Sequence, residues 1–401
     1  METMTPLRGR PVIRNARGNM RLLIVSHSCA QSSNQRLYEE LQFLTGWEIT
    51  LALPADWEDE FGNTLDQMPL DALGARARKI PVLMNGNIIL HIYRQRWGKF
   101  LRDGRFNAIY VNHEPYALAT AQVCWANLRQ RCPAPFGFYS CQNITKNYPP
   151  PFSILERMVY RHSKFAFPIT RAVAEVLRAK GYAGAATVCA LPVDVEAYFP
   201  RGRDEDERLI PREPGQTVIG YVGRVVEAKG MRTLAGAMGC LSDLPWKLVV
   251  IGSGDFSEEF LRIMESHGLA GRVTFAGYVP HTETPRYLSA FDLLVLPSET
   301  QPNWKEQFGR AITEAMACGT AVVGSDSGEI PNLIRSSGGG LVFPERNVKE
   351  LADALRTMMT DPQFRQKCAE DGKAWTLARV SLKGIAETMA ATLDRAASPL
   401  R

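Results

Sequence analysis

The sequence predicts an α/β protein built from two doubly wound parallel-sheet domains. Short apolar runs alternate with longer helical stretches along the chain, which is typical of parallel sheets whose strands are connected by helices. The 401 residues are more than one compact domain usually holds, and the 45% apolar content is that of a globular chain. A stretch at 200–216 contains three prolines and two glycines, and we interpret it as an interdomain linker.

Ten apolar runs have the length and composition of buried strands. Five are in the first half of the chain, at 21–26, 48–53, 108–112, 136–140 and 165–169. Five are in the second half, at 217–222, 247–251, 272–275, 292–296 and 320–324. Helical patterns follow strands, for example at 312–318 and 347–359, and 374–397 is helical in pattern as well. Two such units bind ligands at the carboxyl ends of their strands, so we look for chemistry there.

Charge and cysteine content exclude several classes of protein. The net charge of +5 is too small to indicate a nucleic-acid partner, although residues 1–200 carry 23 Lys/Arg against 16 Asp/Glu, while 201–401 carry 24 against 26. The eight cysteines form no CxxC pair and no zinc-like cluster, which indicates reduced thiols in a cytoplasmic protein. Residues 1–19 contain four arginines and no apolar run, so they are no secretory signal, and we expect the folded part to begin at Met20.

A glycine turn with two cations follows the strand predicted at 217–222. The turn reads Gly223-Arg224-x4-Lys229-Gly230, and a helix is expected to follow it. Backbone N–H groups at a helix N-terminus form an anion site, and Arg224 and Lys229 add a planar fork and a point charge beside it. A diphosphate suits this arrangement. The alternative is a pair of surface cations near an ordinary turn.

Two glutamates eight positions apart flank the start of a later helix. The segment reads Glu306-x-Phe308-Gly309-x4-Glu314, with Glu306 ahead of the helix and Glu314 one turn inside it. A carboxylate accepts hydrogen bonds from two neighbouring hydroxyls, which suits a sugar diol. Taken alone, the spacing equally fits an amphipathic helix with two solvated acids.

Together, these motifs resemble the retaining glycosyltransferases of family 4, which have the GT-B fold. The order and spacing of the glycine turn and the glutamate pair agree with that family, as do two segments that follow, 315–320 and 325–331. The resemblance implies two Rossmann-like domains facing across a cleft. It implies an acceptor domain at 20–199, a donor domain at 215–379 and a last helix at 380–401 that crosses back to the first domain.

The resemblance also implies the roles of individual residues. Arg224 and Lys229 would hold the donor diphosphate and stabilise the leaving group, Glu306 would contact the transferred sugar, and Glu314 would hold the ribose. These three residues, Arg224, Lys229 and Glu306, are the expected catalytic ones. The remaining donor contacts would come from backbone near the phosphate, sugar and base, at Gly223, Val279, Phe308, Gly309 and Arg310.

The acceptor side of the resemblance is less complete. His27 and Ser28 follow the first strand, where relatives commonly have glycines, and His113 follows the strand at 108–112. His113 suits a cleft residue, and a structural histidine bonded to a backbone carbonyl is the alternative. Where many relatives have a further histidine, this chain has Gln142 and Asn143, so the sequence names no catalytic base.

The stretch 91–106 has the pattern of a cationic and aromatic helix. At about 100° per residue, Arg94, Lys99, Arg102 and Arg105 fall on one arc and the aromatic side chains on the other. Such a face at 91–105 suits peripheral contact with an anionic membrane or acceptor. The alternative is that the aromatics pack on the sheet and the cations are solvated.

The implied activity is transfer of a sugar from a UDP- or GDP-sugar to an acceptor hydroxyl. The acceptor would be a small molecule, a lipid-linked sugar or an oligosaccharide, in bacterial polysaccharide, glycolipid or natural-product assembly. We expect no cofactor and no metal, because Arg224 and Lys229 neutralise the phosphates and the Asp204-Glu205-Asp206 triplet lies in the charge-dense linker. The alternatives are a nucleotide-sugar epimerase on a related fold and a nucleotide-sugar-binding protein without activity.

Overall fold

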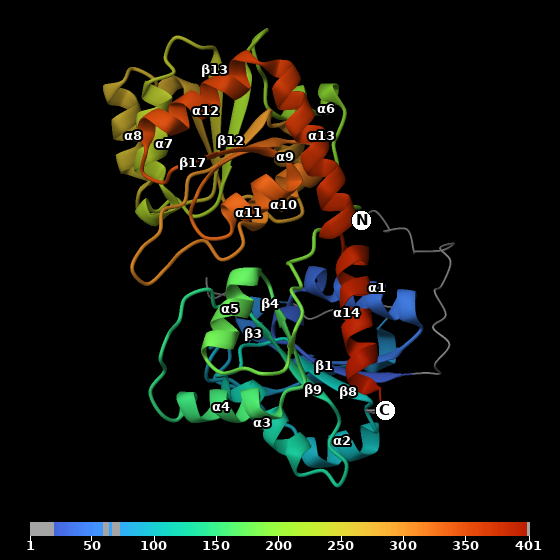
Figure 1. Ribbon diagram of the computed structural model, residues 1–401. Coiled ribbons are helices and arrows are strands. Elements are labelled where there is room, and N and C mark those ends of the chain that lie inside the picture. Colours follow the sequence, from blue (N-terminus) through green and yellow to red (C-terminus); the bar gives the residue numbers. More distant parts are fainter. Residues whose placement is uncertain (1–19, 59–63, 66–72, 399–401) are drawn as a thin grey trace. The chain divides into compact units, whose positions relative to one another are not determined.

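The computed structural model describes residues 20–58, 64–65 and 73–398, so the prefix 1–19 lies outside the described residues. The chain forms two compact units, each a parallel sheet with helices packed against it (Figure 1). Unit 1 comprises the described residues up to Cys141, Thr145–Cys189 and those from Ile385 onward. Unit 2 comprises Gln142–Ile144 and Ala190–Gly384.

The sheet of unit 1 has seven parallel strands in the order β11-β10-β9-β8-β1-β2-β5. Their bounds are β1 Arg21–Val25, β2 Glu48–Pro54, β5 Ala77–Ile80, β8 Ala108–Val111, β9 Phe136–Ser140, β10 Phe165–Pro168 and β11 Ala185–Ala186. Two short antiparallel pairs lie outside this sheet: β3 Trp57–Glu58 with β4 Thr64–Leu65, and β6 Val82–Leu83 with β7 Ile92–Tyr93.

Helices of unit 1 bury apolar faces against this sheet. They are α1 Arg36–Thr45, α2 Trp97–Gly104, α3 Leu118–Leu128, α4 Phe152–His162, α5 Arg171–Ala179 and α14 Leu382–Ala397, with short 3-10 turns at Ser28–Ala30, Ser32–Gln35 and Gly74–Arg76. The central strand β8 is buried along its whole length, as a strand covered on both faces should be. The Thr392 hydroxyl of α14 lies 3.1 Å from that of Thr187.

The sheet of unit 2 has six parallel strands in the order β14-β13-β12-β15-β16-β17. Their bounds are β12 Thr217–Val222, β13 Trp246–Ile251, β14 Val273–Gly277, β15 Leu293–Leu296, β16 Ala321–Ser325 and β17 Gly340–Phe343. All ten strands that the apolar runs predict are present in the two sheets, each within about two residues of the expected bounds.

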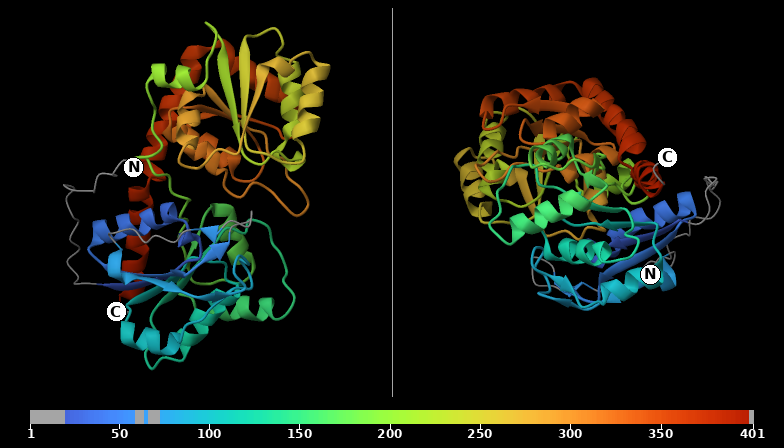
Figure 2. Two further views of the ribbon diagram at one scale, coloured as in Figure 1. Left: turned by 180° about the vertical axis from the view of Figure 1, so that it is seen from behind. Right: turned by 60° about the horizontal axis from the view of Figure 1, so that its bottom comes forward.

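Helices flank the sheet of unit 2 in two groups, as the view from behind in Figure 2 shows. Helix α7 packs against α8 and α12, while α10 packs against α9 and α13. The bounds are α6 Arg203–Leu209, α7 Met231–Gly239, α8 Ser257–Ser266, α9 Thr284–Ala290, α10 Arg310–Ala317, α11 Ile330–Ser337, α12 Val348–Thr360 and α13 Pro362–Arg379, with 3-10 turns at Glu227–Lys229 and Ala270–Arg272.

The strand orders place one topological switch point in each unit. In unit 1 the chain runs outward from β1 through β2 to β5, and then from β8 to β11 on the other side, so the switch lies between β1 and β8. In unit 2 the same reasoning places it between β12 and β15. Crevices at the carboxyl ends of such strand pairs bind ligands in open α/β sheets.

The predicted helix at 91–106 is wrong over half of its length. Only Trp97–Gly104 is helical, because residues 92–93 pair with β6 as strand β7 and Arg105 ends the helix in a left-handed conformation. Arg94 therefore lies outside the helix, and the four cations do not share one helical face. Trp97 and Leu101 are buried while Arg102 is exposed, which favours the interpretation of packed aromatics and solvated cations. Membrane contact through 91–105 stays an untested prediction.

The expected linker 200–216 is also partly structured. It contains α6, so the Asp204-Glu205-Asp206 triplet lies on a helix instead of in an extended linker. Glu205 forms ion pairs with Arg201 and Arg286. The high charge of this stretch gives no apolar helical period, so the sequence did not indicate the helix. Ion pairs of this kind and packing against α9 stabilise it. None of the helices in the described part of the chain has the length and apolarity to cross a bilayer.

Candidate functional site

The switch point of unit 2 has a tight backbone turn at its centre. Gly223 directly follows β12, and its amide donates to the carbonyl of Ile251 at the end of β13, 3.0 Å away. A Cβ on Gly252 would lie only 2.0 Å from the Gly223 carbonyl oxygen, and Gly252 has a φ of +121°. Glycine is therefore required at position 252 for the ends of β12 and β13 to approach this closely. As a result, backbone groups and not side chains occupy this point at the edge of the sheet.

The two predicted cations take different positions beside this turn. Arg224 is exposed, and its carbonyl accepts a hydrogen bond of 2.6 Å from the Tyr221 hydroxyl, which fixes the turn. Lys229 ends a 3-10 turn, and Gly230 follows with a φ of +71° at the start of α7. A Cβ on Gly230 would lie 1.8 Å from the carbonyl oxygen of Pro297, so the start of α7 is pressed against the end of β15.

Lys229 and Glu306 form a largely buried ion pair across the switch point. The Nζ of Lys229 lies 2.6 Å from Oε2 of Glu306, and the side chains are 15% and 11% exposed. The Ser298 hydroxyl donates to the same carboxylate oxygen at 2.9 Å. The ring of Trp304 lies 4.7 Å from the Lys229 ammonium, a cation–π distance. Residues 77 positions apart in the sequence thus meet where an anionic ligand would be bound.

The backbone of Glu306 is held from two sides. Its carbonyl accepts from the amide of Glu329 at 3.2 Å and from the side-chain amide of Asn143 at 3.0 Å. Asn143 is grouped with unit 2, so in the structure this residue, expected on the acceptor side, supports the backbone of Glu306. The Cβ position of Gly328 would lie 1.9 Å from the same carbonyl oxygen, which leaves no room for a side chain there.

Glu314 is the second buried carboxylate of the site. Its side chain is 6% exposed and accepts from Nε of Arg310 at 2.7 Å, one helical turn earlier. Gly309 has a φ of +80° and begins α10, while Phe308 is buried. Both glutamates are therefore buried, which excludes the alternative of two solvated acids on an amphipathic helix.

The Arg310 guanidinium extends the site toward the loop after β14. Its NH2 group lies 3.5 Å from Nε2 of His281, and the Tyr198 hydroxyl lies 3.1 Å from Nδ1 of the same ring. Burial lowers the pKa of His281. On this loop, Val279 is half-buried and Tyr278 is 77% exposed. An exposed aromatic ring on a loop at the edge of the sheet can stack on a base.

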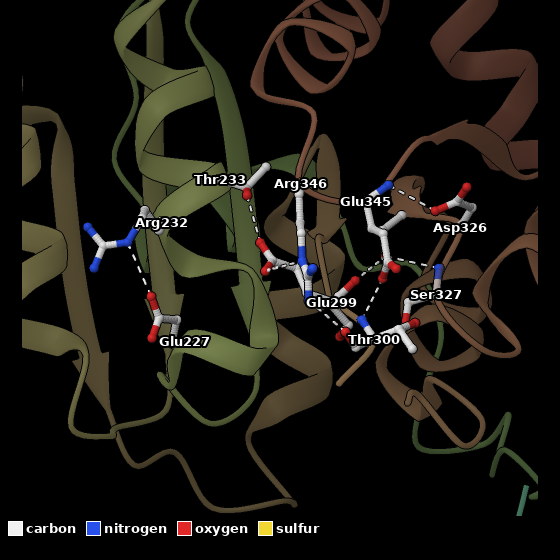
Figure 3. Close-up of polar contacts among 11 residues, drawn as sticks. Glu227, Arg232, Thr233, Glu299, Thr300, Asp326, Ser327, Glu345 and Arg346 are labelled. Atoms are coloured by element: carbon white, nitrogen blue, oxygen red, sulfur yellow. Dashed lines mark hydrogen bonds and ion pairs between the residues drawn. The ribbon is translucent and has the colours of Figure 1, made fainter. Parts of the chain in front are cut away.

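A polar network anchors the loop that follows β15 (Figure 3). Glu299 accepts from the Thr233 hydroxyl at 2.7 Å and pairs with Arg346 at 3.3 Å. Arg346 also donates to the carbonyl of Thr300 at 2.7 Å, and the amide of Thr300 donates to the Glu345 carboxylate. These contacts join the loop to α7 and to the segment before α12. Glu299 and Thr300, at the start of the loop, are therefore held by several independent contacts.

The switch point of unit 1 gathers three other predicted residues, His27, Ser28 and His113. The side-chain amide of Asn112 lies 3.2 Å from the hydroxyls of Ser26 and Ser28, which joins the ends of β8 and β1. His27 and His113 stack with ring centroids 4.3 Å apart. Gln142 is half-buried and belongs to the segment grouped with unit 2.

Glu114, next to His113, is a buried carboxylate that the sequence reasoning did not single out. It accepts from the Ser140 hydroxyl at 2.8 Å and from the Cys141 amide at 2.7 Å. Burial raises the pKa of Glu114, and these hydrogen bonds act in the opposite direction. The contacts tie the ends of β8 and β9 together, so Glu114 positions the loop that carries His113.

Sequence reasoning also missed His91 and Trp57 beside this pair. The His91 ring lies 5.0 Å from His113 and 4.9 Å from Trp57, measured between centroids. Burial lowers the pKa of all three histidines, that of His27 to about 3. The sequence could have indicated the contact between His27 and His113, because each follows one of two neighbouring strands, β1 and β8. It could not indicate His91, which lies in the stretch expected to be a helix.

Comparison with known proteins defines the class to which these features correspond. Residues 202–375 match the family described as Glycosyl transferases group 1, a range that contains both cations and both glutamates of the unit 2 site. The structure is similar to that of a glycosyltransferase from Rickettsia africae, with a TM-score of 0.71, 15% identity and coverage of 95% of this chain and 99% of that one. The structure of Anabaena HepE in complex with UDP is similar with a TM-score of 0.70 and 18% identity, and the match covers 94% of this chain and 100% of that one. The chain thus has the fold of the GT-B glycosyltransferases, and its residues 202–375 match the group 1 family.

More specific relatives share only part of the chain. It is 31% identical over 219 residues to the 2-deoxystreptamine N-acetyl-D-glucosaminyltransferase of Streptomyces fradiae, which is 53% of this chain and 51% of that protein. It is 27% identical over 241 residues to the alpha-D-kanosaminyltransferase of Streptomyces kanamyceticus. This match covers 59% of this chain and 61% of that protein. The chain therefore spans between half and about three fifths of the length of these curated relatives.

Proposed function

We propose that the protein is a retaining glycosyltransferase of family 4 that transfers a sugar from a nucleoside diphosphate sugar to an acceptor hydroxyl. The observation that carries this proposal is the Lys229–Glu306 pair at the switch point of unit 2, beside a glycine turn. A cation at a helix N-terminus suits a diphosphate, and a buried carboxylate beside it suits sugar hydroxyls. The group 1 match over the same residues supports this assignment.

The donor is assigned to unit 2 from the chemistry of each position. Lys229 and Arg224 take the diphosphate, with the backbone at Gly223 beside them. Glu306 accepts from hydroxyls of the transferred sugar, and the backbone at Phe308 and Gly309 donates to the sugar and phosphate. Glu314, held by Arg310, accepts from the ribose, and the loop at Val279 flanks the base. The UDP bound to the structural neighbour HepE is consistent with a uridine donor, and GDP-sugars remain within the proposal.

The proposed mechanism is electrostatic. In a front-face reaction the departing phosphate itself receives the proton of the acceptor hydroxyl, so the enzyme needs no covalent nucleophile. Preorganised cations and amides then stabilise the negative charge that develops on the leaving diphosphate. On this proposal Lys229 and Arg224 do the work that a divalent metal does in other transferases, and no metal or cofactor takes part at the donor site.

The acceptor is proposed to be a small polyhydroxylated molecule or a glycan. The Streptomyces relatives are named for transfer in which 2-deoxystreptamine or kanosamine takes part, and a further relative in Mycobacterium tuberculosis is a mannosyltransferase acting on a phosphatidylinositol mannoside. The 2-deoxystreptamine and the phosphatidylinositol mannoside in these names carry several hydroxyls, whereas kanosamine is named as the sugar that is transferred. On the acceptor side we propose His27, Ser28, His113 and Gln142, and we propose that the enzyme works in the cytoplasm.

A donor and acceptor screen tests the proposal. The purified protein is incubated with single nucleotide sugars, each with and without a panel of acceptors that includes 2-deoxystreptamine. The proposal predicts that a nucleoside diphosphate is released only when an acceptor is present. An epimerised nucleotide sugar without diphosphate release would favour the epimerase alternative, and tight donor binding with no product for any acceptor would favour a binding protein.

A further inference from the structure

Three histidines from distant parts of the sequence converge at the switch point of unit 1. His27 is the second residue after β1, His113 is the second residue after β8, and His91 directly precedes β7. Their ring centroids are 4.3, 5.0 and 5.5 Å apart, and one nitrogen of each ring lies within 4.8 Å of the others. No other such group of metal-binding side chains occurs among the described residues.

Each ring of this histidine cluster has a buried nitrogen without a hydrogen-bond partner. These atoms are Nδ1 of His27, Nε2 of His91 and Nε2 of His113. The His91 side chain is completely buried and His113 is 3% exposed. Buried polar atoms are nearly always satisfied in folded proteins, so three unsatisfied nitrogens in one cluster indicate a bound species that contacts all of them.

Hydrogen bonds to the other ring nitrogens show which lone pairs are available. Nδ1 of His91 donates to the carbonyl of Asn87 at 3.0 Å, which leaves the lone pair on Nε2, as in histidines that bind metals. Nδ1 of His113 accepts from the amide of Glu114 at 2.8 Å, so its proton is on Nε2 in the metal-free chain. Coordination through that Nε2 requires the proton to move to Nδ1 and the contact with the Glu114 amide to be given up.

We propose that His27, His91 and His113 bind one divalent transition-metal ion, Zn²⁺ or a close relative such as Co²⁺. Three imidazoles and no carboxylate form a donor set that suits these ions and not Mg²⁺ or Ca²⁺, which prefer oxygen ligands. At a Zn–N distance of about 2.05 Å in tetrahedral geometry, the nitrogens would lie about 3.3 Å apart, so nitrogens that now lie up to 4.8 Å apart must approach by up to about 1.5 Å. Three protein ligands leave a fourth position for water.

The surroundings are consistent with a protected ion. Trp57 is 6% exposed, and its ring lies 5.1 Å from that of His27 and 4.9 Å from that of His91. An apolar ring at this distance limits the access of water without competing for the metal. This inference is independent of the proposed donor chemistry in unit 2, and it departs from the sequence-based expectation that the protein binds no metal.

Cobalt binding to the full-length protein tests the inference. The tag-free protein is freed of metal with a chelator and titrated with Co²⁺, while visible absorption and bound metal per chain are measured. We expect one Co²⁺ per chain, with the intense bands of a four- or five-coordinate ion, and displacement by Zn²⁺. Failure to bind one equivalent of Co²⁺ would overturn the proposal.

Matched histidine variants locate the site. His91→Ala and His113→Ala should each lower cobalt affinity by at least a hundredfold, whereas His162→Ala, which removes an exposed histidine at the end of α4, should bind as the parent does. Circular dichroism shows whether each variant folds. Unchanged binding by the folded His91→Ala and His113→Ala variants would overturn the proposal.

X-ray absorption of the zinc-loaded parent protein gives an answer that does not depend on any variant. The proposal predicts imidazole scattering from three ligands at about 2.0–2.1 Å and no sulfur shell. The chain has eight cysteines, so a sulfur shell at about 2.3 Å would place the metal elsewhere and contradict the assignment.

Discussion

Replacement of Lys229 by alanine is the sharpest perturbation of the unit 2 site. The ammonium is 2.6 Å from the Glu306 carboxylate, and in the proposed reaction it faces the leaving diphosphate. Removal of one preorganised charge-stabilising group costs about 3–4 kcal/mol of transition-state stabilisation. At about 1.4 kcal/mol for each factor of ten, turnover should fall by roughly 10²- to 10³-fold.

The same substitution should also lower stability, and the two effects can be separated. Breaking a buried ion pair by removing one partner costs about 3–5 kcal/mol. We expect the lower end of that range, because the Glu306 side chain is 11% exposed and keeps its hydrogen bond from Ser298. The double variant Lys229→Met/Glu306→Gln removes both charges, so it should recover most of the stability while remaining inactive.

The assay is acceptor-dependent release of nucleoside diphosphate at saturating substrates, together with thermal unfolding of each variant. Lys349→Ala, which removes an exposed lysine of α12, is the control and should match the parent in both measurements. Turnover of Lys229→Ala within tenfold of the parent would refute the role that we give to this residue.

Three further predictions concern the surroundings of the site. Gly328→Ala should lower activity at least tenfold, because its Cβ would lie 1.9 Å from the Glu306 carbonyl oxygen. Gly268→Ala is the control: Gly268 has a φ of +69° but open space around it, so this change should cost only about 1 kcal/mol of stability and leave kcat unchanged. Glu314→Gln should raise the donor KM about tenfold or more with a smaller change in kcat, as loss of a ribose contact predicts, and an unchanged KM would contradict that role. Burial lowers the pKa of His281, so on acidification below about 6.5 the unfolded chain takes up a proton that the folded chain does not, and stability should fall by up to about 1.4 kcal/mol per pH unit. His281→Asn should make the fall in stability between pH 7.5 and 5 less steep, although His27, His91 and His113, whose pKa values burial also lowers, still contribute to it. Identical profiles for variant and parent would reject the assignment.

Much of the fold could be predicted because buried parallel strands are continuous apolar runs. Nine of the ten predicted strands are mostly buried, whereas the edge strand β14 has no fully buried residue and was predicted from its apolar composition. The edge strand β5 escaped prediction because two of its four residues are charged and exposed. Helix α6 was hidden by the charges and prolines of 200–216, and the helix expected at 91–106 was too long because residues 92–93 pair with another strand.

The unit 2 site was predictable because local motifs carry it. Gly223–Gly230 and Glu306–Glu314 each follow a strand, and the two strands β12 and β15 are neighbours in the sheet. The histidine cluster of unit 1 could not be predicted in the same way. Its members are 64 and 22 positions apart, and only the fold places His91 beside the ends of β1 and β8.

The central claim is that unit 2 binds a nucleoside diphosphate sugar and that the protein transfers this sugar to an acceptor. Mass spectrometry of a reaction with one donor and one acceptor tests it most directly, because it measures glycosylated product and nucleoside diphosphate in the same sample. Our account predicts one diphosphate for each sugar transferred, with neither formed by Lys229→Ala above about a hundredth of the parent rate. Diphosphate released without glycosylated product, or a nucleotide sugar isomerised without diphosphate release, would contradict it.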